Sequence, residues 1–285
     1  MMRSAVFLIT AEDRKGLVAD ITGFFAGQNL NILECRQYSD MLEKQYYMRI
    51  AVELPPEMTH AGLEAKFGEV AARLDLHFSV HYSGEVQNIA VMVSKTTHCL
   101  YDLLTGSEEN RLGGGKVKLV IGNHPELEEA AEKFKVPFYC FPVTRSGDPE
   151  QERRIVDLLE KQRIDLIVLA RYMRILSDEF INRFPARIIN IHHAFLPAFM
   201  GGNPYRQAWE RGVKMIGATA HYATADLDEG PIIEQDVERI THESLPEDLR
   251  DRGRDIERRV LTRAVRAHLE HRVIISGHRT IVFSK

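Results

Sequence analysis

The chain has 285 residues, of which 44% are hydrophobic and 27% charged, so it is long enough for one large or two ordinary globular domains. Its formal net charge of -4 disfavours a general nucleic-acid binder. The opening apolar run is too short for a signal peptide and no later stretch approaches about 18 apolar residues, so we expect a cytoplasmic protein with no membrane span.

The first third of the chain alternates strand-like and helix-like runs. Apolar patterning predicts strands at 5–10, 30–38, 45–53 and 76–82, with helices at 16–28 and 59–74. This β-α-β-β-α-β order is typical of the split ferredoxin-like fold. We therefore expect a small α/β domain over residues 1–84.

The segment AEDRKGLVADITGFFAGQNLNI resembles the ACT family, and the resemblance covers residues 5–84. It implies a domain that binds an amino acid and pairs through its sheet, and hence a homo-oligomer, either a dimer or a tetramer. The turn from Asp13 to Leu17 would lie near the effector pocket, with Gly16 at the helix start, where a backbone can approach a ligand closely. A tight turn alone would also explain Gly16, so both interpretations stay open.

After a polar link at 83–87 the pattern changes to short apolar strands separated by helices, which predicts a Rossmann-like, mainly parallel sheet over residues 85–285. The expected strands span 89–93, 116–121, 136–141, 164–169 and 188–191. A charged helix at 246–270 and a hairpin around Ser276 and Gly277 follow. Ligands of such sheets bind beyond the carboxyl ends of the strands, so the residues just after Val93, Leu169 and Ile191 should matter most.

Polar side chains stand at one of these strand ends. Strand alternation places Asn190 and His192 on one face, so an amide donor and an imidazole can converge on one carbonyl group. In HYATADLDEGPII, Asp228 stands in a short loop between apolar strands, and its carboxylate would orient the imidazole for proton transfer. Each residue also has a structural explanation, with Asn190 as a strand-end cap, His192 as a buried hydrogen-bonded histidine and Asp228 as a turn former.

The order of these residues favours chemistry over such separate roles. N-I-H, then L-P, a glycine-containing turn and H-Y-x-x-x-x-L-D-x-G-P make residues 88–285 similar to the folate-dependent formyltransferase family. The resemblance implies that the Asn190 amide binds the formyl oxygen. It also implies that His192 assists proton movement and that Asp228 orders the histidine and a water molecule, without a metal.

The stretch ARYMRILS is similar to the folate segment of that family. The similarity implies that main-chain groups recognise the pterin edge and that a loop closes over its other side. The residues concerned are Met173, Arg174, Ile175 and Leu176 in the first segment and Ala223, Thr224, Ala225 and Asp226 in the loop. Core packing would also explain Met173 and Leu176, and it can coexist with backbone recognition.

The segment SKTTHCLYDLL favours hydrolysis over transfer. Family members that formylate glycinamide ribonucleotide have a glycine-containing loop at this place, whose amides bind the substrate phosphate. Residues 94–100 contain no glycine, so their side chains should fill the acceptor pocket and leave water as the nucleophile.

Together with the ACT-like segment, this resembles the hydrolytic branch of the family. The resemblance implies 10-formyltetrahydrofolate as substrate, no permanently bound cofactor, and tetrahydrofolate and formate as products. The formate would supply purine synthesis and the reaction would balance one-carbon pools. Methionine and glycine are the implied amino-acid effectors.

Some residues depart from the family pattern or carry no predicted chemistry. Ala194 stands where the family commonly has serine, which puts one loop hydrogen bond in question, and the glycine-rich segment 105–116 also differs from the expected sequence. Cys35, Cys99 and Cys140 form no zinc-type spacing, so we expect free thiols.

Three alternatives to a metal-free hydrolase stay open. The first is a formyltransferase that acts on an amine acceptor, and strict dependence on an amine would reveal it. The second is a non-catalytic, amino-acid-sensing folate binder. The third is a metal hydrolase built on His192, His193 and His221, although their spacing matches no common ligand motif.

Overall fold

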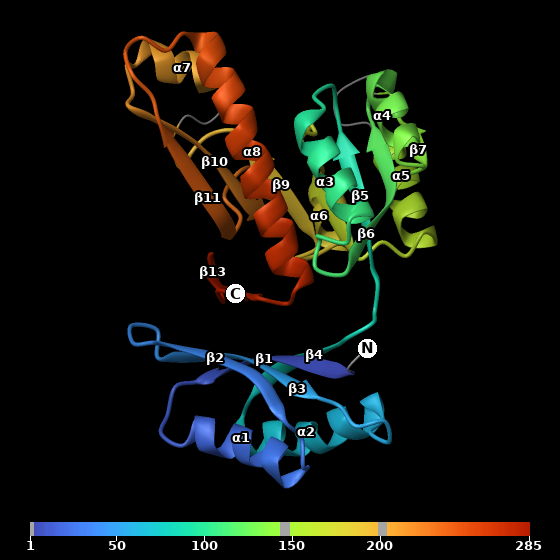
Figure 1. Ribbon diagram of the computed structural model, residues 1–285, viewed down its shortest axis with the longest axis vertical. Helices are drawn as coiled ribbons and strands as arrows, with labels where there is room; N and C mark the ends of the chain where they lie inside the picture. The colour runs from blue at the N-terminus through green and yellow to red at the C-terminus, as the bar shows by residue number, and fades with distance from the viewer. Residues whose placement is uncertain (1–2, 143–148, 199–203) are drawn as a thin grey trace. The chain divides into compact units, whose positions relative to one another are not determined.

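The computed structural model describes residues 3–142, 149–198 and 204–285, and its contacts divide the chain into two compact units (Figure 1). Unit 1 is the chain up to Glu85 together with His271–Ile274 and Ile281–Lys285, and unit 2 is Val86–Glu270 with Ile275–Thr280. Across the described residues, no helix is both long and apolar enough to span a membrane.

Unit 1 contains a four-stranded antiparallel sheet in the order β2-β3-β1-β4. Its elements are β1 (Ser4–Glu12), α1 (Leu17–Gly27), β2 (Ile32–Asp40), β3 (Gln45–Glu53), α2 (His60–Leu74) and β4 (His77–Tyr82). The six elements follow in the order that the sequence predicts. β2 is displaced by two residues at each end, because Asn29 turns with a φ of 55° and Leu30 packs in the core instead of pairing.

Both helices of unit 1 cover the same face of its sheet (Figure 1). Alternate residues of β1 point into this core, where Phe7, Phe25 and Phe67 bring their ring centroids within 4.8–5.6 Å of one another. The opposite face of β3 carries Tyr47, which packs with Ile274 and Phe283. The C-terminal hairpin, expected within residues 85–285, therefore contributes part of its length to the packing of unit 1.

Unit 2 is built on a seven-stranded sheet in the order β11-β10-β9-β8-β5-β6-β7. The strands from β5 to β9 pair in parallel, whereas β10 and β11 are antiparallel. The strands are β5 (Gln87–Val93), β6 (Gly115–Gly122), β7 (Phe138–Cys140), β8 (Leu166–Leu169), β9 (Ile188–His192), β10 (Met215–Tyr222) and β11 (Ile232–Arg239). The prediction of an α/β fold with a mainly parallel sheet is confirmed.

Helices cover both faces of this sheet. They are α3 (His98–Glu108), α4 (Glu128–Lys133), α5 (Pro149–Lys161), α6 (Asp178–Arg183), α7 (Pro204–Glu210) and α8 (Pro246–Leu269), with a 3₁₀ turn η1 (Pro125–Leu127) before α4. In Figure 1, α3 and α8 lie in front of the sheet and α6 lies behind it. Behind it, Ile155, Leu159 and Phe180 pack on Met92 and Leu169 in one buried cluster.

Two turns of the chain use backbone geometry that the sequence indicates. The hairpin β12 (Val273–Ser276) and β13 (Arg279–Val282) turns at Gly277, which has a φ of 58°. In the glycine-rich segment 105–116, Gly113 and Gly114 have φ values of 62° and 95°. A Cβ on Gly115 would overlap the Leu269 and Ile89 side chains, so this glycine permits close packing of β6.

Candidate active site

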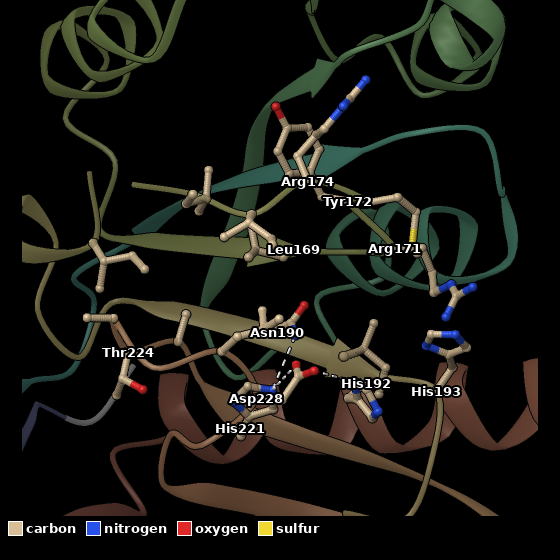
Figure 2. Close-up of a pocket in the computed structure, with 18 residues that line it drawn as sticks. Leu169, Arg171, Tyr172, Arg174, Asn190, His192, His193, His221, Thr224 and Asp228 are labelled. Carbon is tan, nitrogen blue, oxygen red and sulfur yellow. Dashed lines mark hydrogen bonds and ion pairs between the residues drawn. The ribbon is translucent and has the colours of Figure 1, made fainter. Parts of the chain in front are cut away.

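A pocket of about 270 Å³ opens at the carboxyl ends of β8 and β9 (Figure 2). The structure brings the three predicted catalytic side chains, Asn190, His192 and Asp228, to its wall. Seven of the eight residues predicted to hold the pterin also line it: Met173, Arg174, Ile175, Leu176, Ala223, Thr224 and Ala225. Asp226 is exposed and does not line it, although its carbonyl accepts a hydrogen bond from the Thr224 hydroxyl at 3.0 Å.

One carboxylate joins two histidines at the centre of this pocket. His192 Nδ1 lies 3.1 Å from Asp228 Oδ2, and His221 Nε2 lies 3.6 Å from Asp228 Oδ1. Asn190 Nδ2 lies 3.2 Å from the same His221 nitrogen. Figure 2 shows these four side chains facing one another, so an amide, two imidazoles and a carboxylate form one connected group.

Strand pairing explains why His221 belongs to this group. Asn190 and His192 share one face of β9, and the antiparallel register sets His221 of β10 directly opposite Asn190. Directly opposed residues of paired strands lie within contact distance. From the sequence, His221 was predicted only as a possible metal ligand, because periodicity does not reveal which strand pairs with β9.

The loop before β11 brings Asp228 to the histidines. Asp228 has a φ of 60°, and Gly230 lies so close to the Tyr222 carbonyl that a Cβ would overlap it. The Tyr222 amide donates to the Pro231 carbonyl at 3.0 Å. Only glycine permits this close approach, which fixes the loop where its carboxylate meets His192.

Hydrogen bonds settle the charge and the tautomers of the group. Contacts with His192 and then with His221 hold the pKa of Asp228 well below its ordinary value, so the carboxylate stays ionised. His192 therefore carries its proton on Nδ1 toward Asp228. Its Nε2 is buried and has no hydrogen-bond partner in the described part of the chain, which leaves that nitrogen for a ligand or water.

The second histidine is oriented by its own backbone. His221 Nδ1 lies 2.9 Å from the Tyr222 carbonyl oxygen, which only accepts, so this nitrogen carries the proton. Nε2, on the other side of the ring, lies 3.2 Å from Asn190 Nδ2 and can accept a hydrogen bond from this amide. One N–H of the Asn190 amide is thereby used, and its second N–H stays available.

The predicted pterin segment follows β8 and is tied to the end of β5. The Met173 amide donates to Ser94 Oγ at 2.9 Å. The side chains of Met173 and Ile175 are 57% and 70% exposed, whereas Leu176 is buried in the cluster behind the sheet. Core packing therefore accounts for Leu176 but not for Met173 or Ile175, whose apolar side chains stand open at the pocket.

A second hollow, of about 540 Å³, adjoins the pocket and shares Arg171, Met173 and His193 with it. Of residues 94–100, Thr96 and His98 line this hollow, whereas Cys99 and Leu100 are buried in the core. That this segment fills the space of an acceptor stays a prediction.

The proposed metal-binding trio is not assembled. Within the described residues, one set of three potential ligand side chains meets within 4.8 Å, and it consists of His98, Cys99 and Glu257. His192 and His221 instead face different oxygens of Asp228. The three cysteines are free thiols, as expected.

The loop after β9 has its own hydrogen bonds despite the alanine at 194. Thr219 Oγ1 donates to the Ala194 carbonyl at 2.9 Å and accepts from the Leu196 amide at 3.0 Å. Gln235 Nε2 donates to the same hydroxyl at 2.9 Å. The threonine therefore fastens this loop through backbone groups, and a cis Leu196–Pro197 bond follows.

The predicted effector residues lie in unit 1. Gly16 precedes α1 with a φ of 94°, and the Asp13 amide donates to the Lys44 carbonyl at 2.8 Å. Leu17 is buried in the core, so a ligand at this turn would meet its backbone and not its side chain.

Comparison with known proteins finds relatives that are similar over nearly the whole chain. The formyl transferase family model matches residues 87–265. The formyltetrahydrofolate deformylase of Synechocystis sp. is 43% identical over 282 residues, which cover 99% of each chain. That of Bacillus subtilis is also 43% identical, over 97% of this chain and 93% of its own.

Solved structures agree with these relatives. A formyltetrahydrofolate deformylase from Pseudomonas syringae superposes with a TM-score of 0.94 at 38% identity, over 100% of this chain and 95% of that one. Glycinamide ribonucleotide transformylase 1 from Symbiobacterium toebii has a TM-score of 0.67 at 33% identity, over 72% of this chain and 97% of its own. The chain belongs to the formyl transferase family and, within it, to the formyltetrahydrofolate deformylases.

Proposed function

We infer that this chain hydrolyses 10-formyltetrahydrofolate to tetrahydrofolate and formate, and so supplies formate to purine synthesis and balances one-carbon pools. The observation that carries this inference is the match to the deformylases over nearly the full length of both chains. The pocket supports it, because an ionised carboxylate, an unpartnered imidazole nitrogen and an amide donor face one space.

The first step forms the bond between water and the formyl carbon. His192 Nε2 accepts a proton from the attacking water, and Asp228 stabilises the resulting imidazolium through its bond to Nδ1. The free N–H of Asn190 donates to the formyl oxygen as negative charge develops on it. His221 holds the amide in the orientation that this donation requires.

The second step breaks the bond between the formyl carbon and N10. The imidazolium of His192 returns its proton to N10, which leaves as the amine of tetrahydrofolate. Formic acid then loses a proton to solvent, so one water is consumed and one formate and one proton are released. His192 therefore moves the proton in both steps, and neither step requires a metal.

The pterin is proposed to enter between the two loops of the pocket. The backbone of Met173 to Leu176 and the loop from Ala223 to Ala225 would form its two walls. Apolar walls with a few main-chain polar groups are typical of sites for flat heterocycles.

We propose that unit 1 is an ACT-like regulatory domain, with the boundary to the catalytic domain at residues 84 and 85. The β-α-β-β-α-β order and the strand order β2-β3-β1-β4 support this proposal. Its effector, methionine or glycine, would bind at the turn of Asp13, Gly16 and Leu17. Pairing of such domains would make the protein a dimer or a tetramer.

Transfer to an amine is the second candidate function. The hollow beside His193 favours it, because that space could admit an acceptor. In that case an amine nitrogen would occupy the position of the attacking water, and the three side chains would play the same parts.

The Asp228→Asn variant tests the roles assigned to the site. The amide occupies the same space but carries no charge to stabilise the imidazolium, so kcat should fall by about a hundredfold or more. Folate binding, measured by calorimetry with tetrahydrofolate, should stay close to that of the unmodified protein. Normal turnover by this variant would refute the role of Asp228.

A further inference from the structure

Arg171 stands between the catalytic pocket and the adjoining hollow. It lines both spaces, and Figure 2 shows its guanidinium group beside the His193 ring. Its backbone has a φ of 63°, a left-handed conformation that is unfavourable for residues other than glycine. The chain therefore accepts backbone strain at a position that lines both spaces.

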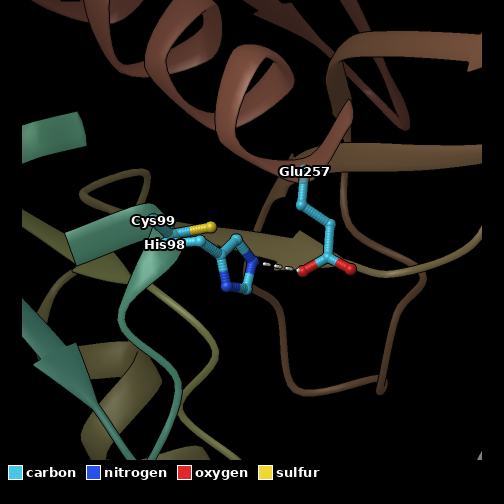
Figure 3. Close-up of side chains that lie close together, drawn as sticks. All are labelled: His98, Cys99 and Glu257. Atoms are coloured by element: carbon cyan, nitrogen blue, oxygen red, sulfur yellow. Dashed lines mark hydrogen bonds and ion pairs between the residues drawn. The ribbon is translucent and has the colours of Figure 1, made fainter. Parts of the chain in front are cut away.

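The carboxylate nearest to Arg171 is already bound by other groups. Glu257 is 1% exposed, its Oε2 accepts from His98 Nε2 at 2.9 Å, and its Oε1 accepts from the Tyr205 hydroxyl at 2.5 Å. Figure 3 shows the first of these contacts, between α3 and α8. Although burial opposes ionisation, the His98 bond and the Arg171 charge hold the pKa of Glu257 below its ordinary value.

Glu257 balances the charge of Arg171 without satisfying its hydrogen-bond donors. Arg171 Nε lies 3.4 Å from Glu257 Oε2, yet Nε and Nη1 are buried and make no hydrogen bond in the described part of the protein. The Thr96 hydroxyl, which faces the same hollow, is also buried and unpartnered there. Buried charged donors without partners are costly, so this wall is suited to a small polar ligand.

A metal ion is a poor match for this cluster. Burial and then the charge of Glu257 raise the pKa of the Cys99 thiol well above its ordinary value, and Glu257 is engaged with His98 and Tyr205. The guanidinium of Arg171 would repel a cation. The unpartnered N–H groups of Arg171 instead favour an anion. A planar guanidinium presents paired N–H groups that match a carboxylate.

We propose that Arg171 binds the formate ion released by hydrolysis and that formate leaves through the adjoining hollow. The site rests on the proposed function for the source of its ligand, since formate is the only carboxylate that the reaction creates at the formyl carbon. His193 is beside Arg171, and Arg250 and Arg254 line the same hollow. The positive charges of the two arginines continue the path for an anion away from the tetrahydrofolate.

The test measures binding of ¹³C-formate to the whole protein by NMR line broadening, which requires no turnover. In Arg171→Gln, whose side chain occupies the same strained backbone without the charge, the dissociation constant of formate should rise at least about tenfold. The binding of tetrahydrofolate should not change. Arg111→Gln, on an exposed arginine, is the matched control and should bind formate normally.

Two further measurements keep the test decisive. Because Arg171→Gln leaves Glu257 without its counter-charge, the double variant Arg171→Gln, Glu257→Gln restores neutrality and should show the same loss if it is folded. Formamide, a neutral ligand of the same shape, should bind equally weakly to all variants.

The outcomes separate this inference from the proposed function. Equal formate binding by Arg171→Gln and the unmodified protein would overturn the inference, as would an equal loss of tetrahydrofolate binding. Formate binding that depends on Arg171 supports the site even if 10-formyltetrahydrofolate is not hydrolysed, and that result would refute only the proposed function.

Discussion

The amide of Asn190 is the side chain whose role can be isolated most cleanly. It contributes no charge and no proton, so its loss removes one donor from the developing oxyanion. A single such donor is worth about 2.7 to 4 kcal/mol, so Asn190→Ala should lower kcat by about a hundredfold or more with little change in KM. Asn182→Ala, on the exposed surface of α6, should retain normal kinetics, and equal losses in both variants would contradict the assignment.

His221 should act through Asn190 and Asp228 and not by direct contact with the substrate. His221→Ala frees the Asn190 amide to rotate, and misplacement of a catalytic group typically costs about tenfold or more in kcat. The second measurement is a double-mutant cycle. If His221 positions the amide, adding His221→Ala to Asn190→Ala should cost much less than it does in the unmodified protein, whereas fully additive losses would exclude this role.

At the level of elements, α8 carries a contact that shapes the hollow. Gly253 lies on its buried face, and a Cβ there would overlap the Tyr205 ring that reaches Glu257. Alanine normally favours a helix over glycine by about 1 kcal/mol, but overpacking costs about 1–3 kcal/mol. Gly253→Ala should therefore lower the free energy of unfolding measured in urea.

A matched substitution separates propensity from packing. Gly68 in α2 has nothing within 4 Å of a built Cβ, so Gly68→Ala should stabilise its unit by about 0.5–1 kcal/mol. If Gly253→Ala stabilised the protein to the same extent, the close contact with Tyr205 would be refuted.

Periodicity predicted most elements, because each depends on residues adjacent in the chain. Most strands of both units appear where apolar runs predicted them, although β10 and β11 were predicted without bounds, and β9 extends one residue further to include His192. Strand order could not be predicted in this way, since it depends on pairing between distant segments. For that reason His221, opposite Asn190, was not included in the site.

The burial of a charged residue could not be predicted from the sequence either. Glu257 lies in a run of charged residues on α8, and only the packing of α3 and α8 shows that it is buried against His98. Side-chain size likewise does not reveal direction, since Cys99 and Leu100 of the segment 94–100 are buried in the core. The site residues of the family motif, in contrast, are local in sequence and meet at one pocket.

The stability of the whole molecule should depend on pH through His193. Burial, followed by the charge of Arg171, lowers the pKa of His193 from 6.5 to about 4. Between these values the unfolded chain binds a proton that the folded protein does not, so stability is lost as the pH falls. One proton corresponds to at most about 1.4 kcal/mol per pH unit.

The His193→Gln variant checks this dependence. Unfolding in urea between pH 4 and 6.5 should show a shallower loss of stability for the variant than for the unmodified protein. An unchanged slope would mean that His193 is protonated equally in both states.

The central claim is that water, and not an amine, receives the formyl group at Asn190, His192 and Asp228. The most direct measurement mixes the purified protein with 10-formyltetrahydrofolate alone and follows formate and tetrahydrofolate together. We predict that both products appear in equal amounts, without any amine, and that the Asp228→Asn variant produces neither at a comparable rate. An enzyme that remains inactive until an amine acceptor is added, and then formylates it, would contradict the account.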